Sequence, residues 1–124
     1  MQKNKRSLTS NTGKFKDFDE YQKFCKSTAV YPKIGKSFVY PLIGLQGEVG
    51  EVSEKIKKMF RDDKGKLTEE KKTEIVKELG DVVWYISQLA TEFDVKFSDV
   101  IKGNIEKLSS RQIRGKLHGS GDNR

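Results

Sequence analysis

Apolar side chains recur every three or four residues between Thr68 and Phe93, and this spacing constrains the fold more than any other feature of the chain. It places them on one face of an α-helix. Thr68 suits the N-cap, and Glu69 and Glu70 suit the positive end of the helix dipole. The segment therefore predicts a long helix that must bury one broad face. That face comprises Ile75, Leu79, Val82, Val83, Ile86, Leu89, Ala90 and Phe93.

Two earlier segments show helical spacing as well. The first helix is expected to begin at Asp17 and to end near residues 29–33, because Pro32 disfavours helix at the residue before it. The second is expected to carry Pro41 in its first turn and to run to about Phe60. Its inner stripe comprises Leu45, Val49, Val52, Ile56 and Met59.

The end of the chain predicts one more helix. A polar turn is expected at residues 61–66, and Ser98 is expected to cap a fourth helix that fades near residues 114–115. Its apolar residues are Val100, Ile101, Ile105 and Leu108. No segment predicts a strand beyond a brief extended stretch at residues 39–40. Four helices with short links predict an all-α, four-helix bundle.

The composition suggests that this bundle is completed by oligomerisation. Only 34% of the 124 residues are apolar and 35% are charged, which is a surface-rich balance for one domain. The expected organisation is a flexible basic tail at residues 1–16, a helical domain at residues 17–114 and a glycine-rich tail at residues 115–124.

The sequence predicts a cytoplasmic protein. No run of about 18 apolar residues is present, so no membrane span is expected. The basic N-terminus lacks the apolar segment of a secretory signal. The single cysteine, Cys25, fits a reducing compartment, and its helical neighbours favour a structural role in packing.

The net charge of +7 is unevenly distributed. Residues 1–36 carry nine basic and three acidic side chains, residues 37–101 carry ten and thirteen, and residues 102–124 carry six and two. An acidic centre thus lies between two basic ends. A nucleic-acid binder does not need that acidic centre, whereas a site for a metal-bound polyphosphate needs charges of both signs.

Two pairs of acidic residues supply a candidate metal site. Glu48 and Glu51 are three residues apart on the second helix, and Glu78 and Asp81 have the same spacing on the third. Each pair therefore shares one helix face, and two such pairs can converge on facing helices. Hard oxygen ligands without histidine or cysteine favour Mg²⁺, with Mn²⁺ as a possible substitute.

The competing interpretation is that these acids form a solvated helix face. Against it, both pairs lie beside apolar stripes, and glycines accompany them at positions 44, 47, 50 and 80. A glycine inside a helix costs roughly 1 kcal/mol relative to alanine. Three glycines at spacing three on one helix indicate close approach of another helix or of a ligand.

The same residues resemble a known family, the MazG-like nucleoside triphosphate pyrophosphohydrolases, over roughly residues 17–124. The hallmark is an E-x-x-E pair, a spacer and an E-x-x-D pair, found here in the segments 44–52 and 77–85 with a spacer over 52–77. Residues 104–108, Arg111, residues 114–115 and 119–124 are similar to the C-terminal part of small members.

The resemblance implies magnesium-dependent cleavage of a nucleoside or deoxynucleoside triphosphate to the monophosphate and pyrophosphate, by water attack at the α-phosphate. It implies that Glu48, Glu51, Glu78 and Asp81 are the metal ligands and that the protein is a homodimer or homotetramer. Glu51 is a candidate for orienting the water or taking its proton. Base and sugar preference are left open.

Candidate substrate-binding residues complete this prediction. Lys55 lies seven residues after Glu48 on nearly the same helix face, and Tyr85 lies four after Asp81. The fourth helix offers a polar stripe in which motif correspondence favours the first two members; the stripe comprises Asn104, Lys107, Arg111 and Arg114. Residues 123–124 are further candidates, if the C-terminal tail folds over the site.

Two other classes of function are also compatible with the sequence. One is a non-catalytic helical protein that binds nucleic acid through its basic ends, although no helix carries a long basic face. The other is a partner-binding protein that has kept the fold and lost turnover. The presence of all four expected carboxylates favours the enzyme.

Overall fold

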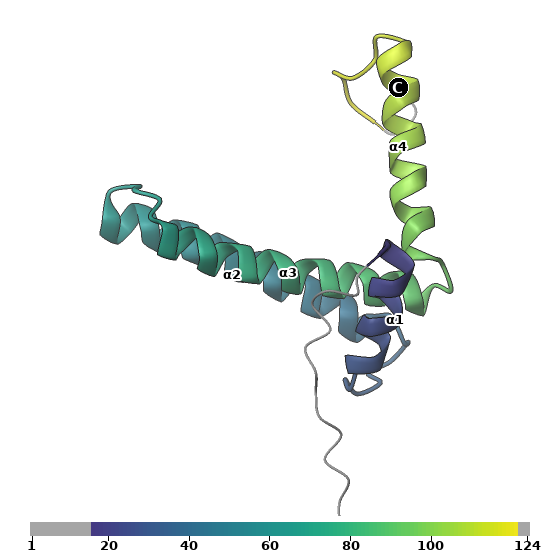
Figure 1. The fold of residues 1–124 in the computed structure, drawn as a ribbon, viewed down its shortest axis with the longest axis horizontal. Coiled ribbons are helices and arrows are strands. Elements are labelled where there is room, and N and C mark those ends of the chain that lie inside the picture. Colours follow the sequence, from purple (N-terminus) through teal and green to yellow (C-terminus); the bar gives the residue numbers. More distant parts are fainter. Residues whose placement is uncertain (1–15, 122–124) are drawn as a thin grey trace, which may run out of the picture.

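Four helices follow one another along the chain in the computed structural model, which describes residues 16–121 (Figure 1). The part of the chain so described contains no strand. The predicted all-α fold is therefore confirmed. The helices are α1 (Phe18–Thr28), α2 (Val39–Asp63), α3 (Glu69–Glu92) and α4 (Phe97–Ile113).

Helices α2 and α3 lie side by side as a long antiparallel hairpin (Figure 1). Helix α2 ends at Asp63, not near Phe60 as predicted from the polar residues that follow. Polar residues do not end a helix by themselves. The helix stops where Lys64 adopts a left-handed conformation (φ 53°) and Gly65 follows with φ 77°, both amides donating to the Met59 carbonyl.

The predicted starts of the helices are confirmed in part. Asp17 and Thr68 act as N-caps, accepting hydrogen bonds from the amides of Glu20 and Lys71. Pro41 lies in the first turn of α2, as expected, and the helix already begins at Val39, so residues 39–40 are helical and not extended.

Helix α4 begins one residue before the predicted cap. Its N-cap is Lys96, and Ser98 lies inside the first turn. The prediction that Ser98 caps the helix is wrong because a carboxylate of α1 takes that role. Both the amide and the hydroxyl of Ser98 donate to Asp19, at 3.1 and 2.8 Å.

Helix α1 packs against α3 and the start of α4. Cys25 is completely buried there, which agrees with a structural role for this thiol. Beyond its first turns, α4 projects away from the hairpin and makes no contact with α2 (Figure 1). The direction of α4 is thus determined at its junction with α1 and α3.

Much of the apolar surface that the sequence places on helix faces is open. On the hairpin, Ile43, Phe60 and Val76 are more than half exposed, and on α4 the same holds for Ile105. Few large apolar side chains within residues 16–121 are buried, among them Met59 and Phe97. Apolar helix faces exposed to this degree normally have a partner in solution.

Candidate metal centre

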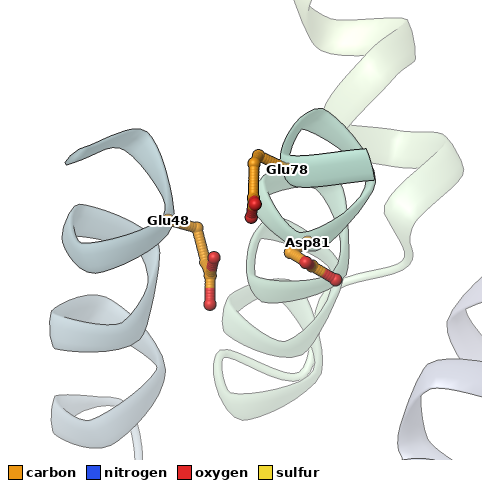
Figure 2. A group of neighbouring side chains, drawn as sticks. All are labelled: Glu48, Glu78 and Asp81. Atoms are coloured by element: carbon orange, nitrogen blue, oxygen red, sulfur yellow. The ribbon is translucent and has the colours of Figure 1, made fainter. Parts of the chain in front are cut away.

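Three of the four predicted metal ligands come together between α2 and α3. Glu48 from α2 and Glu78 and Asp81 from α3 each offer a carboxylate oxygen within 4.8 Å of the other two (Figure 2). The carboxylates of Glu48 and Glu78 lie in the space between the two helices (Figure 2). We refer to these three residues as the acid cluster.

The local structure explains why these side chains meet. Glu78 and Asp81 are three residues apart on α3 and so lie on adjacent turns of one face. The hairpin brings the middle of α2 beside them. Glu48 and Glu78 are partly buried, whereas Asp81 is exposed, so the cluster is open to solvent on one side.

The electrostatics of the cluster favour a cation. Burial and the neighbouring charges of Asp81, Glu78 and Glu51 all raise the pKa of Glu48 above its ordinary value of 4.5. Like charges held this close disfavour each other's ionised forms. Hard carboxylate oxygens at this separation fit a hard divalent ion such as Mg²⁺ or Mn²⁺, which would remove the repulsion.

One cation of the chain already reaches the cluster. The Lys55 ammonium lies 3.2 Å from the Glu78 carboxylate, across the gap between α2 and α3, and both side chains are partly buried. The sequence placed Lys55 on the same side of α2 as Glu48. The ion pair with Glu78 could not be predicted, because it depends on how the two helices are aligned.

The fourth predicted ligand, Glu51, lies outside this group of three and is exposed. Its charge still contributes to the raised pKa of Glu48. The spacing of the pair does not explain this separation. Glu78 and Asp81 have the same three-residue spacing and do meet, so the separation of Glu51 depends on how α2 is rotated against α3.

The four candidates on α4 are not brought to the acid cluster within one chain, because α4 projects away from the hairpin (Figure 1). Asn104, Lys107 and Arg114 are exposed, whereas Arg111 is buried. The chain after α4 turns back at the end of that helix, where the Lys116 amide donates to the Arg111 carbonyl at 2.7 Å. The predicted contribution of residues 123–124 lies outside the described residues.

Tyr85 lies beside the acid cluster. Burial, followed by the nearby Tyr40, Glu48 and Asp81, raises the pKa of Tyr85. Its ring covers the backbone of α2 at Gly44, where a Cβ atom would overlap the ring. The expected close approach at a helix glycine is therefore found at position 44. At positions 47, 50 and 80 no described atom beyond the adjoining residues and backbone of the same helix lies within 4 Å of the place of a Cβ.

The chain is similar to known proteins over most of its length. The family model described as the MazG nucleotide pyrophosphohydrolase domain matches residues 41–114, which include all four candidate ligands. The chain is also 45% identical over 111 residues to the Gene 37 protein of Mycobacterium phage L5, covering 86% of this chain and 97% of the phage protein. No solved structure matches the chain.

Within residues 16–121, no helix combines the length and the apolar character needed to cross a membrane.

Proposed function

Because the chain belongs to the MazG nucleotide pyrophosphohydrolase family, we propose that it is a magnesium-dependent enzyme that cleaves nucleoside or deoxynucleoside triphosphates. The products are the nucleoside monophosphate and pyrophosphate. The observation that carries this proposal is the convergence of Glu48, Glu78 and Asp81 from two helices within 4.8 Å of one another.

Glu48, Glu78 and Asp81 would hold the cation, with Glu51 as a fourth ligand or as the partner of a second ion. Bound magnesium would offset the charge of the phosphates and lower the pKa of an attacking water. Mn²⁺ would substitute, since it accepts the same oxygen ligands. The open side of the cluster, at Asp81, is where a triphosphate would approach.

Glu51 is the side chain we propose to orient the water. It is exposed next to the cluster and is not one of the three converging carboxylates, so one of its oxygens can face solvent while the other holds an ion. The water oxygen would bond to the α-phosphorus while the bond from that phosphorus to the α–β bridging oxygen breaks. Glu51 would accept the water proton, and pyrophosphate would leave with the bonding electron pair.

Lys55 and the basic residues of α4 would bind the phosphates. Lys55 lies at the cluster itself, paired with Glu78. Lys107, Arg111 and Arg114 lie on a helix that points away from the cluster of its own chain. We therefore propose a homodimer or homotetramer in which α4 of one copy approaches the cluster of another, together with Asn104. The open apolar side chains of the hairpin and α4 support such an assembly.

The direct test is to incubate the protein with each nucleoside and deoxynucleoside triphosphate, with and without magnesium, and to measure pyrophosphate. We expect magnesium-dependent release that is abolished in Glu51→Gln. Glu54→Gln is the matched control, because Glu54 lies one turn nearer α2's end and pairs with Lys57 and Lys58. Absence of hydrolysis, or salt-sensitive nucleic-acid binding in its place, would contradict the proposal. Full activity in Glu51→Gln would remove that residue from its role.

Subunit mixing tests the shared site. Glu78→Gln and Lys107→Ala are each expected to be nearly inactive alone. If the two residues act from different copies, a refolded mixture recovers partial activity, since some sites then contain both native residues. A mixture no more active than its components, or a protein that sediments as a monomer, would contradict the assembly.

A further inference from the structure

Four aromatic rings form a continuous chain of contacts next to the acid cluster. Tyr40 stacks on Tyr31, with ring centroids 5.3 Å apart and planes at 10°. Tyr31 meets the edge of Trp84 at 6.1 Å, and Trp84 meets Tyr85 at 4.9 Å, both nearly perpendicular. Since Tyr85 lies one turn after Asp81 on α3, this group of rings adjoins the carboxylates directly.

The polar atoms of these rings divide into two kinds. The Trp84 indole N–H donates to Thr28 at 2.9 Å. The Tyr31 hydroxyl donates to Glu92 at 2.6 Å and accepts from Gln88 at 3.1 Å. By contrast, the hydroxyls of Tyr40 and Tyr85 have no hydrogen-bond partner among residues 16–121, although both side chains are partly buried. Neither hydroxyl oxygen is fully buried, so both are open to solvent and can exchange water for a ligand group.

Gly44 holds one of these two rings in place. A Cβ atom at position 44 would overlap Cε1 and Cζ of Tyr85, so the ring rests directly on the α2 backbone. Gly44 is four residues after Tyr40, which puts Tyr40 one turn away on the same face of α2. The two free hydroxyls therefore belong to neighbouring rings, one from each helix of the hairpin.

We propose that Tyr40 and Tyr85 bind the nucleoside part of the substrate, and that Gly44 is the positioning residue that keeps Tyr85 in place. This inference rests on the proposed function and deepens it. A triphosphate held at the acid cluster extends from there toward its sugar and base. The uncharged phenols beside the carboxylates suit those neutral groups better than a phosphate, because each offers a ring face for stacking and a hydroxyl that both donates and accepts.

The experiment compares two probes that differ only in the nucleoside. A non-hydrolysable nucleoside triphosphate and inorganic tripolyphosphate are each titrated, with magnesium, into the full-length protein and into Tyr40→Phe, Tyr85→Phe and Tyr31→Phe. The Tyr31 variant is the matched control, since its hydroxyl is used by Glu92 and Gln88. We expect Tyr40→Phe and Tyr85→Phe to weaken nucleotide binding about threefold to tenfold each, the effect of one hydrogen bond, and to leave tripolyphosphate binding unchanged.

The outcomes separate the two proposals. Equal weakening of both probes would make the tyrosines phosphate contacts and overturn the inference, as would unchanged nucleotide binding in both variants. If Tyr31→Phe weakened nucleotide binding as much as the other two, the effect would come from the ring cluster's packing, and the inference would fail. If the wild-type protein bound tripolyphosphate with magnesium but no nucleoside triphosphate, the proposed nucleoside site would be wrong, whereas the proposed metal centre would still be supported. Binding of neither probe would overturn both.

Discussion

Two carboxylates of this protein have opposite environments. The contrast distinguishes a region that stabilises the fold from a region suited to activity. At the junction of α1 with α4, both oxygens of Asp19 accept hydrogen bonds from Ser98, and these bonds lower the pKa of Asp19. In the acid cluster, burial and neighbouring negative charges raise the pKa of Glu48. Asp19 has donors within the chain, whereas Glu48 faces other acids. A bound cation would stabilise the cluster by offsetting this repulsion.

Gln22 makes further hydrogen bonds at the same junction. The Gln22 amide donates to the Val95 carbonyl at 2.9 Å and to the Thr91 hydroxyl at 3.2 Å, and its oxygen accepts from the Phe97 amide at 2.9 Å. One side chain of α1 thus makes three hydrogen bonds with groups at and beside the turn between α3 and α4. We expect changes at the junction to affect stability and changes at the cluster to affect activity.

The largest expected effect is on turnover. Glu48→Gln removes a metal ligand and should lower kcat by about a hundredfold or more, because metal ions stabilise such transition states by several kcal/mol. Its free energy of unfolding, measured in chelator, should rise, since one of the repelling charges is gone.

Gln22→Ala should instead lower the stability and leave turnover nearly unchanged. It loses three hydrogen bonds, which costs about 1–3 kcal/mol of stability, and should keep near-normal kcat below its melting temperature. A large loss of stability in Glu48→Gln would contradict the contrast.

The next effect in size is the response to metal. A cation that binds only the folded protein stabilises it by about 3 kcal/mol at a hundredfold excess over its Kd. Thermal unfolding of the wild type should therefore shift upward with Mg²⁺ or Mn²⁺, and chelator should abolish both the shift and the activity. Gln22→Ala should show a shift of the same size from a lower starting point, and Glu48→Gln little or none. Equal shifts in all three proteins would place the bound metal elsewhere.

The two regions also differ in how far they could be predicted from sequence. Helical spacing predicted the acid pairs and the same-face arrangement of Glu78 and Asp81, because these depend on one helix. The position of Glu51 outside the converging group depends on how α2 is rotated against α3, which the spacing does not determine. The start of α4 was misplaced at Ser98 for a similar reason, since its capping partner, Asp19, lies 79 residues away in sequence.

Glycines illustrate the same limit. The sequence indicated close approach along one face of α2, and the structure locates it at Gly44 alone among the glycines of that helix. No local signal distinguished Gly44 from Gly47 and Gly50, because the difference lies in Tyr85 on the other helix. The direction of α4 was likewise beyond prediction, since the contacts at its base come from α1 and α3.

A smaller effect, of about 1 kcal/mol, tests the packing beside the cluster. Gly44→Ala should destabilise the wild type because its Cβ overlaps the Tyr85 ring. In the Tyr85→Ala background the same change should stabilise α2 by about 1 kcal/mol, the ordinary helix preference of alanine over glycine. Gly47→Ala, with open space around its Cβ, is the control and should stabilise in both backgrounds. Chemical denaturation measures all of these, and the same sign for Gly44→Ala in both backgrounds would show that Gly44 does not act through Tyr85.

The smallest effect is the pH dependence of stability, which should have opposite signs at the two carboxylates. The pKa of Glu48 is raised by folding, so its unfavourable contribution is absent below its ordinary value of 4.5 and appears as the pH rises through the folded pKa. In chelator, Glu48→Gln should therefore exceed the wild type in stability only above the pH interval in which the Glu48 carboxyl loses its proton.

The pKa of Asp19 is lowered by folding, so its favourable contribution is present above 3.8 and is lost as the pH falls through the folded pKa. Asp19→Asn should be less stable than the wild type at neutral pH and should approach it in acid. If instead the gain of Glu48→Gln grew as the solution was acidified, the acid cluster would not be a site of mutual repulsion, and the case for a cation there would weaken.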